Sequence, residues 1–170
     1  RHTYPHINLS IKQCGDRELL ESLESGIIDI VFSSPYLFQH KANINSQIIS
    51  KSPICAVMHI NHPLAQNKSI SPFLLSNEKI VIMDIQDPRK FAKFKRDCRE
   101  NGISLNIVDQ PANYDNLLLT IESEIGIALL PRILEQYSSP NLRFVELNSD
   151  MSVEIGIFWL KSTENTSVPL

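Results

Sequence analysis

Hydrophobic and polar positions follow two different periods in the first part of the chain. Strict alternation over residues 6–11 predicts a half-exposed strand, whereas the nearly continuous apolar run over 27–32 predicts a strand buried on both faces, as in a parallel sheet. Between them, leucines at helical spacing form one apolar face over 16–25, and Gly26 follows as a stop signal. These segments predict a β–α–β unit with a right-handed crossover.

The clearest helix signal follows residue 87. Asp87 is a predicted N-cap, Pro88 fits the first helical position, apolar residues recur at i, i+3 and i+7, and Gly102 predicts the end. Between Pro35 and Pro53 the polar composition predicts a loop with one weak strand near 47–49. Further strands are predicted over 54–58, 80–83, 105–108, 125–130, 142–145 and 153–159, with short helices from 72, after a cap at Asn113, and up to Tyr137. Strands that alternate with helices predict an α/β fold with largely parallel sheets.

Composition places the chain among ordinary globular proteins. It has 170 residues, 42% of them hydrophobic and 21% charged, enough for one large domain or two small lobes. Sixteen basic against nineteen acidic residues give a net charge of −3, which argues against direct nucleic-acid binding by this chain. The longest apolar stretch, 125–130, is far shorter than the roughly 20 residues of a membrane span. Residues 1–5 show no apolar signal core, so we expect a cytoplasmic protein.

Cysteine and histidine spacing predicts neither disulfides nor a metal site. Cys14, Cys55 and Cys98 are about forty residues apart, unlike the paired spacing of a disulfide framework or a zinc site. We therefore expect reduced and mostly buried thiols. His59 and His62 form an i, i+3 pair, but His62 precedes a proline, which predicts a turn and makes metal ligation accidental. No cofactor is predicted.

Catalytic signatures are weak. The glycines never cluster into a phosphate-binding loop, and neither a nucleophile elbow nor an HExxH motif occurs. Asp84 and Asp87 could be paired carboxylates, although Asp87 is better explained as a helix cap. Six basic residues within 89–99 could bind nucleic acid or a membrane surface. Because an apolar stripe runs along the same predicted helix, we favour the interpretation that these basic residues form its solvated outer face.

Polar residues follow several predicted strands. Ser33-Ser34 follows the strand ending at 32, Asp87-Pro88-Arg89 opens a helix after 80–83, and Asn113-Tyr114 opens another after 105–108. Ligands of open α/β sheets bind at the carboxyl ends of strands, and helix N-termini hold anions. Each feature alone is explained as a cap or a turn. Together they predict a crevice for a small polar or anionic molecule.

Motifs across almost the whole chain resemble the effector-binding domain of LysR-type transcriptional regulators. Each motif is short, but their order and spacing agree with that family. They are YPHINL at 4–9, GD at 15–16, LLESLESGIIDI at 19–30, HPLA at 62–65, GIALLP at 126–131, LRFVEL at 142–147 and IFWLK at 157–161.

The resemblance implies two lobes of the type II periplasmic-binding-protein-like fold, each with a mostly parallel sheet flanked by helices. Lobe I would be 1–53 plus 148–170, and lobe II would be 54–147, with crossings near Pro53 and Leu147. A small effector would bind in the cleft, and the domains would pair as an antiparallel dimer. The family's winged helix-turn-helix, and the first strand and helix of the domain, would precede Arg1. Glu124 stands where the family usually has a small residue or glycine, which would put a charge near the cleft side of lobe II.

The resemblance also implies which residues bind the effector. Ser33, Ser34 and Asn113 would donate hydrogen bonds, Arg89 would be a charge partner, and Tyr114 would form an aromatic wall. The full set is Gly15, Asp16, Ser33, Ser34, Pro35, Gln86, Asp87, Arg89, Asn113 and Tyr114.

The leading hypothesis is therefore an effector-sensing domain that performs no chemistry and controls transcription through a separate DNA-binding module. A solute-binding protein of a transporter would use the same fold but would need export. An α/β enzyme using Asp84, Asp87 or Glu124 is the third alternative, for which no nucleophile–base pair is visible. The sequence identifies neither the effector nor the sign of regulation.

Overall fold

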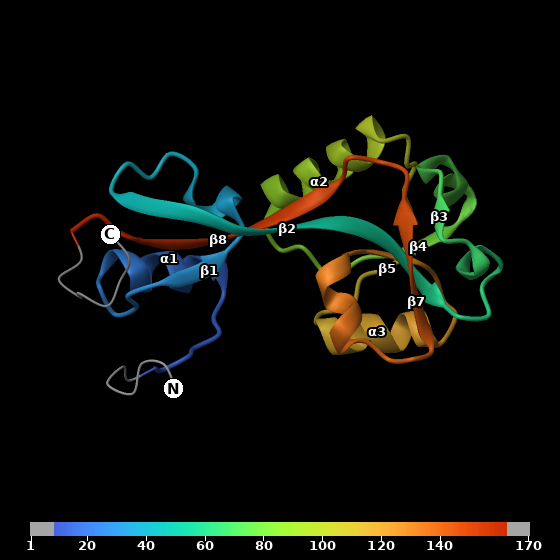
Figure 1. The fold of residues 1–170 in the computed structure, drawn as a ribbon, viewed down its shortest axis with the longest axis horizontal. Coiled ribbons are helices and arrows are strands. Elements are labelled where there is room, and N and C mark those ends of the chain that lie inside the picture. The colour runs from blue at the N-terminus through green and yellow to red at the C-terminus, as the bar shows by residue number, and fades with distance from the viewer. Residues whose placement is uncertain (1–8, 163–170) are drawn as a thin grey trace. The chain divides into compact units, whose positions relative to one another are not determined.

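The chain folds into two compact units in a computed structural model that describes residues 9–162 (Figure 1). Unit 1 comprises Arg1–Lys51 and Glu154–Leu170, and unit 2 comprises Ser52–Val153. Two strands contain the points where the chain passes from one unit to the other: β2 (Ile44–His59) and β8 (Ser152–Leu160).

Unit 1 packs a short helix against a small antiparallel sheet. Its further elements are α1 (Asp16–Glu24), β1 (Val31–Ser33) and the 3₁₀ helix η1 (Pro35–Phe38). Strand β1 pairs antiparallel with β8, with Val31 opposite Phe158. Leu23, Val31 and Phe158 form the core with Phe38, whose ring stacks on that of Phe158 at a centroid distance of 4.1 Å.

The predicted β–α–β unit is wrong in unit 1. Residues 9–11 form no strand, and the side chains of Leu9 and Ile11 are 75% and 86% exposed; the rest of that predicted strand lies outside the described residues. Strand β1 is shorter than the apolar run that predicted it, and Phe32 is 67% exposed. A segment of alternating polar and apolar residues forms a strand only where a neighbouring strand supplies hydrogen bonds. Among the described residues, the only strand beside β1 is β8.

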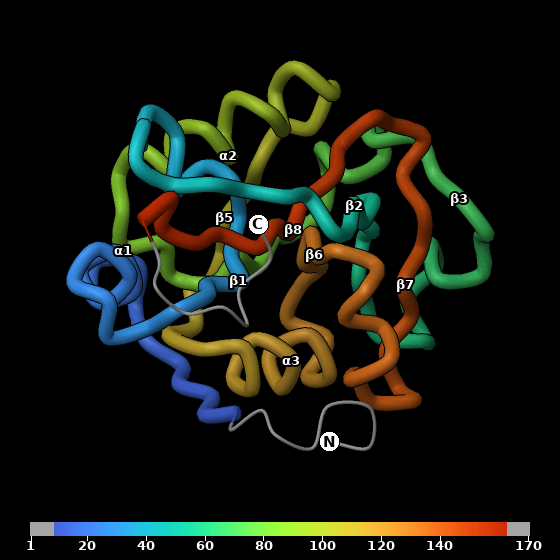
Figure 2. The backbone as a smooth tube through the Cα atoms, turned by 60° about the vertical axis from the view of Figure 1, so that its left-hand side comes forward, coloured from blue at the N-terminus to red at the C-terminus, as the bar shows by residue number. Residues whose placement is uncertain are grey.

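Unit 2 holds two parallel strands between two helices (Figures 1 and 2). Ile80 and Ile82 pack in one hydrophobic cluster with Cys98 of the first helix. Val81, which points to the other face, packs with Leu117 of the second helix. Burial on both faces explains why this segment is apolar without alternation. The elements are β4 (Lys79–Val81), α2 (Pro88–Glu100), β5 (Asn106–Asp109) and α3 (Tyr114–Glu122).

The larger sheet is mixed rather than mostly parallel, which corrects the prediction. Strand β2 pairs antiparallel with both β6 (Ala128–Pro131) and β7 (Leu142–Leu147), and β3 (Ser69–Ile70) pairs parallel with β7. Short 3₁₀ helices complete the unit: η2 (Pro63–Gln66), η3 (Pro72–Asn77) and η4 (Arg132–Tyr137).

The weak strand predicted near 47–49 lies within β2, but the loop predicted around it up to Pro53 is wrong, because β2 continues through this proline as one strand of 16 residues. Proline is tolerated in a strand where its nitrogen is not required as a donor. The residue after the proline again forms a backbone hydrogen bond, since the N–H of Ile54 donates to the carbonyl oxygen of Met151 at 2.9 Å.

The three α-helices of the described chain end in the same way. Beyond each C-cap lies a residue with positive φ: Gly26 at 71°, Gly102 at 77° and Glu124 at 59°. At each end, the positive-φ residue and the residue after it donate their backbone N–H groups to carbonyl oxygens of the last helical turn, as in Ile103 N to Cys98 O at 2.9 Å and Ile125 N to Thr120 O at 3.3 Å. The predicted glycine stops are confirmed, whereas glutamate at the third end was not foreseen.

Candidate functional site

Helices α2 and α3 begin at the same edge of unit 2. Each follows the carboxyl end of one of the parallel strands β4 and β5. Beyond the strands the two segments stay together, because Ile82 N donates to Asp109 O at 3.2 Å and Asp84 N donates to Pro111 O at 2.9 Å. The structure therefore brings residues 86–89 to the edge at which Asn113 and Tyr114 open α3.

Asp87 is the N-cap of α2, as predicted. Its Oδ1 accepts the backbone N–H of Arg89 at 2.8 Å, and its Oδ2 lies 3.1 Å from the Arg89 Nη2. The hydrogen bonds from the Arg89 side chain and backbone, together with the Lys90 backbone N–H, lower the pKa of Asp87. The first donors of α2 thus already have an anionic acceptor, and an external anion would compete with it.

Asn113 caps α3, also as predicted. Its Oδ1 accepts the backbone N–H of Asn116 at 2.9 Å, which leaves the side-chain NH₂ group as the donor that a ligand could use. The first turn of α3 carries Asp115, which complements the positive end of the helix dipole.

Tyr114 packs its ring against the cluster beneath α3. Burial raises the pKa of Tyr114, and its hydroxyl is buried with no hydrogen-bond partner among the described residues. A buried hydroxyl without a partner is unusual in a native structure, and a polar ligand or water could satisfy it.

Gln86 lies between the carboxyl end of β4 and the start of α2. Its Nε2 donates to Oδ2 of Asp84. Asp84 therefore has an amide partner, and Asp87 has Arg89. Of the two carboxylates, Asp87 has a structural role as the cap of α2.

The remaining predicted residues lie in unit 1, where all of them except Ser33 lie at the start of a helix. Gly15 is the N-cap of α1, and its carbonyl oxygen accepts the N–H of Leu19 at 2.9 Å. Ser34 caps η1 with its Oγ 3.5 Å from the Tyr36 backbone nitrogen. The others are Asp16 in the first turn of α1, Ser33 at the end of β1 and Pro35 at the start of η1.

Glu124 lies elsewhere in unit 2, which corrects the expected charge beside the crevice. Its Oε1 is 3.1 Å from Nδ1 of His59. Both residues line a cavity of about 290 Å³ with Lys79, at the amino end of β4 rather than at the end that leads to α2. Glu124 is thus separated from Asp84 and Asp87 along the strand. Within residues 9–162, no group of three or more His, Cys, Asp or Glu side chains is placed to hold a metal ion.

The cysteines are free thiols, of which Cys55 and Cys98 are buried. Burial raises the pKa of both, that of Cys98 to about 12. These two thiols therefore stay protonated at neutral pH and pack as small apolar groups. No helix within residues 9–162 has both the length and the apolar composition to cross a bilayer.

Comparison with known proteins identifies the family. The LysR substrate binding domain family matches residues 1–168. The transcriptional regulator BudR of Raoultella terrigena is 24% identical over 97% of this chain and 57% of its own length. The regulator AlsR of Bacillus subtilis (strain 168) is 23% identical over 97% of this chain and 55% of its own length. The chain thus spans little more than half the length of these curated relatives.

Solved structures show the same fold. The effector binding domain of BenM, solved with its effector benzoate, superposes with a TM-score of 0.84 at 22% identity, covering 98% of this chain and 76% of that one. This likeness confirms the predicted α/β class and the two-lobed, type II periplasmic-binding-protein-like fold. The resemblance seen in the sequence motifs is also confirmed, and the chain belongs to the LysR substrate binding domain family.

Proposed function

We propose that this chain is the effector-sensing domain of a LysR-type transcriptional regulator. It binds a small polar metabolite and thereby controls the DNA binding of a separate helix-turn-helix module. The observation that carries the proposal is the common edge at which α2 and α3 begin, next to the paired strands β4 and β5. Ligands of open α/β sheets bind at such strand ends.

The chemistry of this edge suits a small ligand with both charge and hydrogen-bonding groups. Arg89 supplies a guanidinium, Asn113 an NH₂ group, and Tyr114 a buried hydroxyl. Asp87 already forms an ion pair with Arg89. A ligand that binds the Arg89 guanidinium would therefore share it with the Asp87 carboxylate. In unit 1 we assign Ser33 and Ser34 as further donors, with Gly15, Asp16 and Pro35 beside them in the sequence-predicted set.

The chain acts without catalysis in this proposal. An effector that binds one conformation more tightly shifts the regulator toward that conformation. The relatives support this reading, since BudR and AlsR are transcriptional regulators and BenM binds benzoate as its effector. We further propose that the regulator is cytoplasmic and works as a dimer or higher oligomer.

A thermal-shift screen of this chain against central metabolites, with carboxylates and polar neutral compounds in separate sets, tests the proposal. A ligand of the native state at 100 times its Kd stabilises the fold by about 2.7 kcal/mol, a clear rise in Tm. The compound found is then added to the intact regulator, whose DNA footprint should change. A ligand that binds tightly but leaves the footprint and transcription unchanged would contradict sensing and favour solute carriage.

A further inference from the structure

A second concave site lies in unit 2, away from the start of α2. It is a cavity of about 660 Å³ formed by the C-terminal half of α2, by η3, and by the segment that leads into β5. Its volume falls within the roughly 300–1,000 Å³ typical of small-molecule sites. The residues that line it come from 73–76, 92–99 and 102–105, and none of them belongs to the proposed effector set.

An aromatic ring forms one side of this cavity. Phe73 is 72% exposed, which is unusual for a large aromatic side chain. The ring lies against Gly102, where a Cβ would be 3.0 Å from the Phe73 Cε2. Gly102 also has a φ of 77°, so glycine serves both the helix end and the ring contact. The result is an apolar surface held open to solvent.

Cations form the opposite side. Lys95, Arg96 and Arg99 all line the cavity. The Arg96 Nε lies 3.9 Å from the Glu100 Oε1, a long and exposed ion pair. Arg99 has no ion-pair partner among the described residues. The Lys95 ammonium lies 4.5 Å from the centroid of the Phe91 ring rather than beside an acid. Of these three cations, only Arg96 has a carboxylate partner among the described residues, so this part of the surface carries an excess of positive charge.

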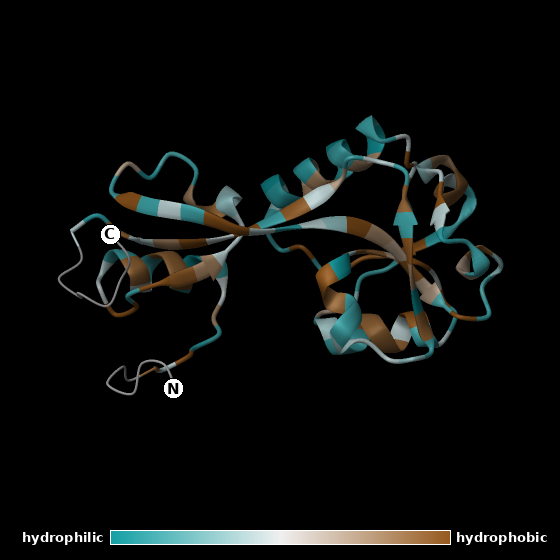
Figure 3. Cartoon of the chain, in the orientation of Figure 1, coloured by the Kyte–Doolittle hydropathy of each residue, from teal (hydrophilic) through white to brown (hydrophobic). Residues whose placement is uncertain are grey.

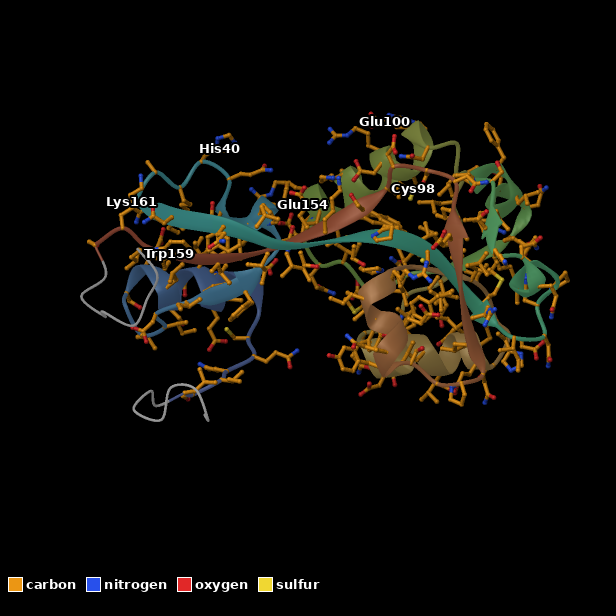
Figure 4. The ribbon with its side chains drawn as sticks, viewed as in Figure 1. His40, Cys98, Glu100, Glu154, Trp159 and Lys161 are labelled. Atoms are coloured by element: carbon orange, nitrogen blue, oxygen red, sulfur yellow. The ribbon has the colours of Figure 1, made fainter. Side chains whose placement is uncertain are left out.

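The two faces of α2 differ in polarity. Cys98 lies on the inner side of the helix, toward the core of unit 2, and Glu100 on the outer side (Figure 4). Hydrophilic residues dominate the helix (Figure 3). On the same helix, Lys93 pairs with Asp97 and does not line the cavity. Lys95, Arg96 and Arg99 therefore line the cavity, whereas Lys93 is paired outside it.

Hydrogen bonds connect the polar residues that line the cavity. Ser76 Oγ accepts the backbone N–H of Ser104 at 3.3 Å and lies 3.5 Å from the carbonyl oxygen of Gly102, to which it donates. This bridge links η3 to the segment after α2, two parts of the chain that are 28 residues apart. It therefore ties η3, the element that carries Phe73, to the segment that follows α2.

We propose that this cavity is a second ligand site, for a small organic anion with a flat apolar body, such as an aryl carboxylate. The ring of such a molecule would lie against Phe73, and its carboxylate would meet Arg99 and Lys95. The concave shape, the exposed aromatic ring and the excess of positive charge favour this class over a simple inorganic anion, which has no apolar surface to bury. The site is independent of the proposed effector site.

Titration of the ¹⁵N-labelled 170-residue chain with 2-naphthoate, followed by NMR, tests this proposal. We expect the amide signals of Gly102 and Ser104 to shift while that of Asn113 stays in place. The neutral analogue 2-naphthylmethanol should bind at least about fivefold more weakly, since it lacks the charge. Arg99→Gln should weaken the binding of 2-naphthoate by about the same factor, and Phe73→Ala should also weaken its binding.

Lys93→Gln is the matched control, because it removes a positive charge from the same helix but not from the cavity. It should leave the affinity unchanged. Equal binding of both compounds, equal loss in the Lys93 and Arg99 variants, or shifts that map to Asn113 would each overturn the proposal. The melting temperatures of the variants show that they remain folded, so a loss of binding reports on the site.

Discussion

The carboxylate of Asp87 makes two kinds of contact with Arg89. One carboxylate oxygen accepts the backbone N–H of Arg89 at 2.8 Å, and the other lies 3.1 Å from the guanidinium. The residue that caps α2 therefore also positions the cation that we assign to the effector. In the effector site that we propose, helix initiation and ligand recognition would be coupled through this one carboxylate.

Replacement of Asp87 should separate these roles. Asp87→Asn keeps an oxygen for the cap but loses the charge, whereas Asp87→Ala loses both, so we expect stability to fall in the order wild type, Asn, Ala. Because Arg89 lowers the pKa of Asp87 below its ordinary 3.8, the advantage of wild type over Asn is fully present above that pH. It is lost as the pH falls through the lower native value. Urea denaturation at a series of pH values measures this, and an advantage that persists at the acid end would contradict the assignment.

Glu124 occupies a position that favours glycine. Its φ of 59° places it in the left-handed region, where the equivalent residues of the other helices are Gly26 and Gly102. Glu124→Gly should therefore stabilise the chain by about 0.5–1 kcal/mol, despite loss of the exposed pair with His59. Thermal denaturation checks this. Gly26→Ala, whose Cβ would meet nothing within 4 Å, should lose a similar amount through strain alone. A destabilised Glu124→Gly variant would show that the His59 pair outweighs the backbone strain.

Gly126 has no room for a side chain. A Cβ there would come within 2.6 Å of the Lys79 carbonyl oxygen, which also accepts the N–H of Ile127 at 2.8 Å. Gly126→Ala should push β4 away from this bond and destabilise unit 2 by about 2–3 kcal/mol, as other overpacked sites do. Gly15→Ala is the matched control, with a φ of −72° and open space around its Cβ. Similar urea midpoints for the two variants would show that the contact relaxes without cost.

Ser52 is a buried hydroxyl with a defined partner. Its side chain is 5% exposed, and its Oγ accepts the backbone N–H of Ile133 at 3.0 Å. Ser52→Ala should cost about 1–2 kcal/mol, because the N–H loses its acceptor. Ser123→Ala removes a hydroxyl that donates to Leu119 O on an exposed helix end, and it should have almost no effect. Equal stability of the two alanine variants in urea denaturation would rule out a role for the Ile133 hydrogen bond.

Local signals in the sequence predicted the helix ends well. Asp87 and Asn113 cap helices, and Gly26 and Gly102 end them, because caps and left-handed residues act within one turn. The motifs that resemble the LysR family then predicted the two-lobed fold in which these helices lie.

Pairing between distant segments was harder to predict. The alternating residues 9–11 form no strand, and β2 runs through Pro53, because both outcomes depend on which strand lies alongside. The cavity beside Phe73 was missed altogether, since Phe73, Arg99 and Ser104 come together only after α2 packs on the sheet. The one signal of the cavity in the sequence is the group of basic residues on α2, whose pattern predicts a solvated outer face of the helix.

Isothermal titration of the metabolite found by the thermal-shift screen tests the central claim most directly. Wild type is compared with Arg89→Gln and Asn113→Ala, and with Arg143→Gln as a control that removes an exposed charge from β7. We predict a loss of affinity of at least about tenfold in the first two variants and no change in the control, because hydrogen bonds to charged groups contribute about 1.5–3 kcal/mol. Full affinity in both Arg89→Gln and Asn113→Ala would contradict an effector site at the start of α2 and α3.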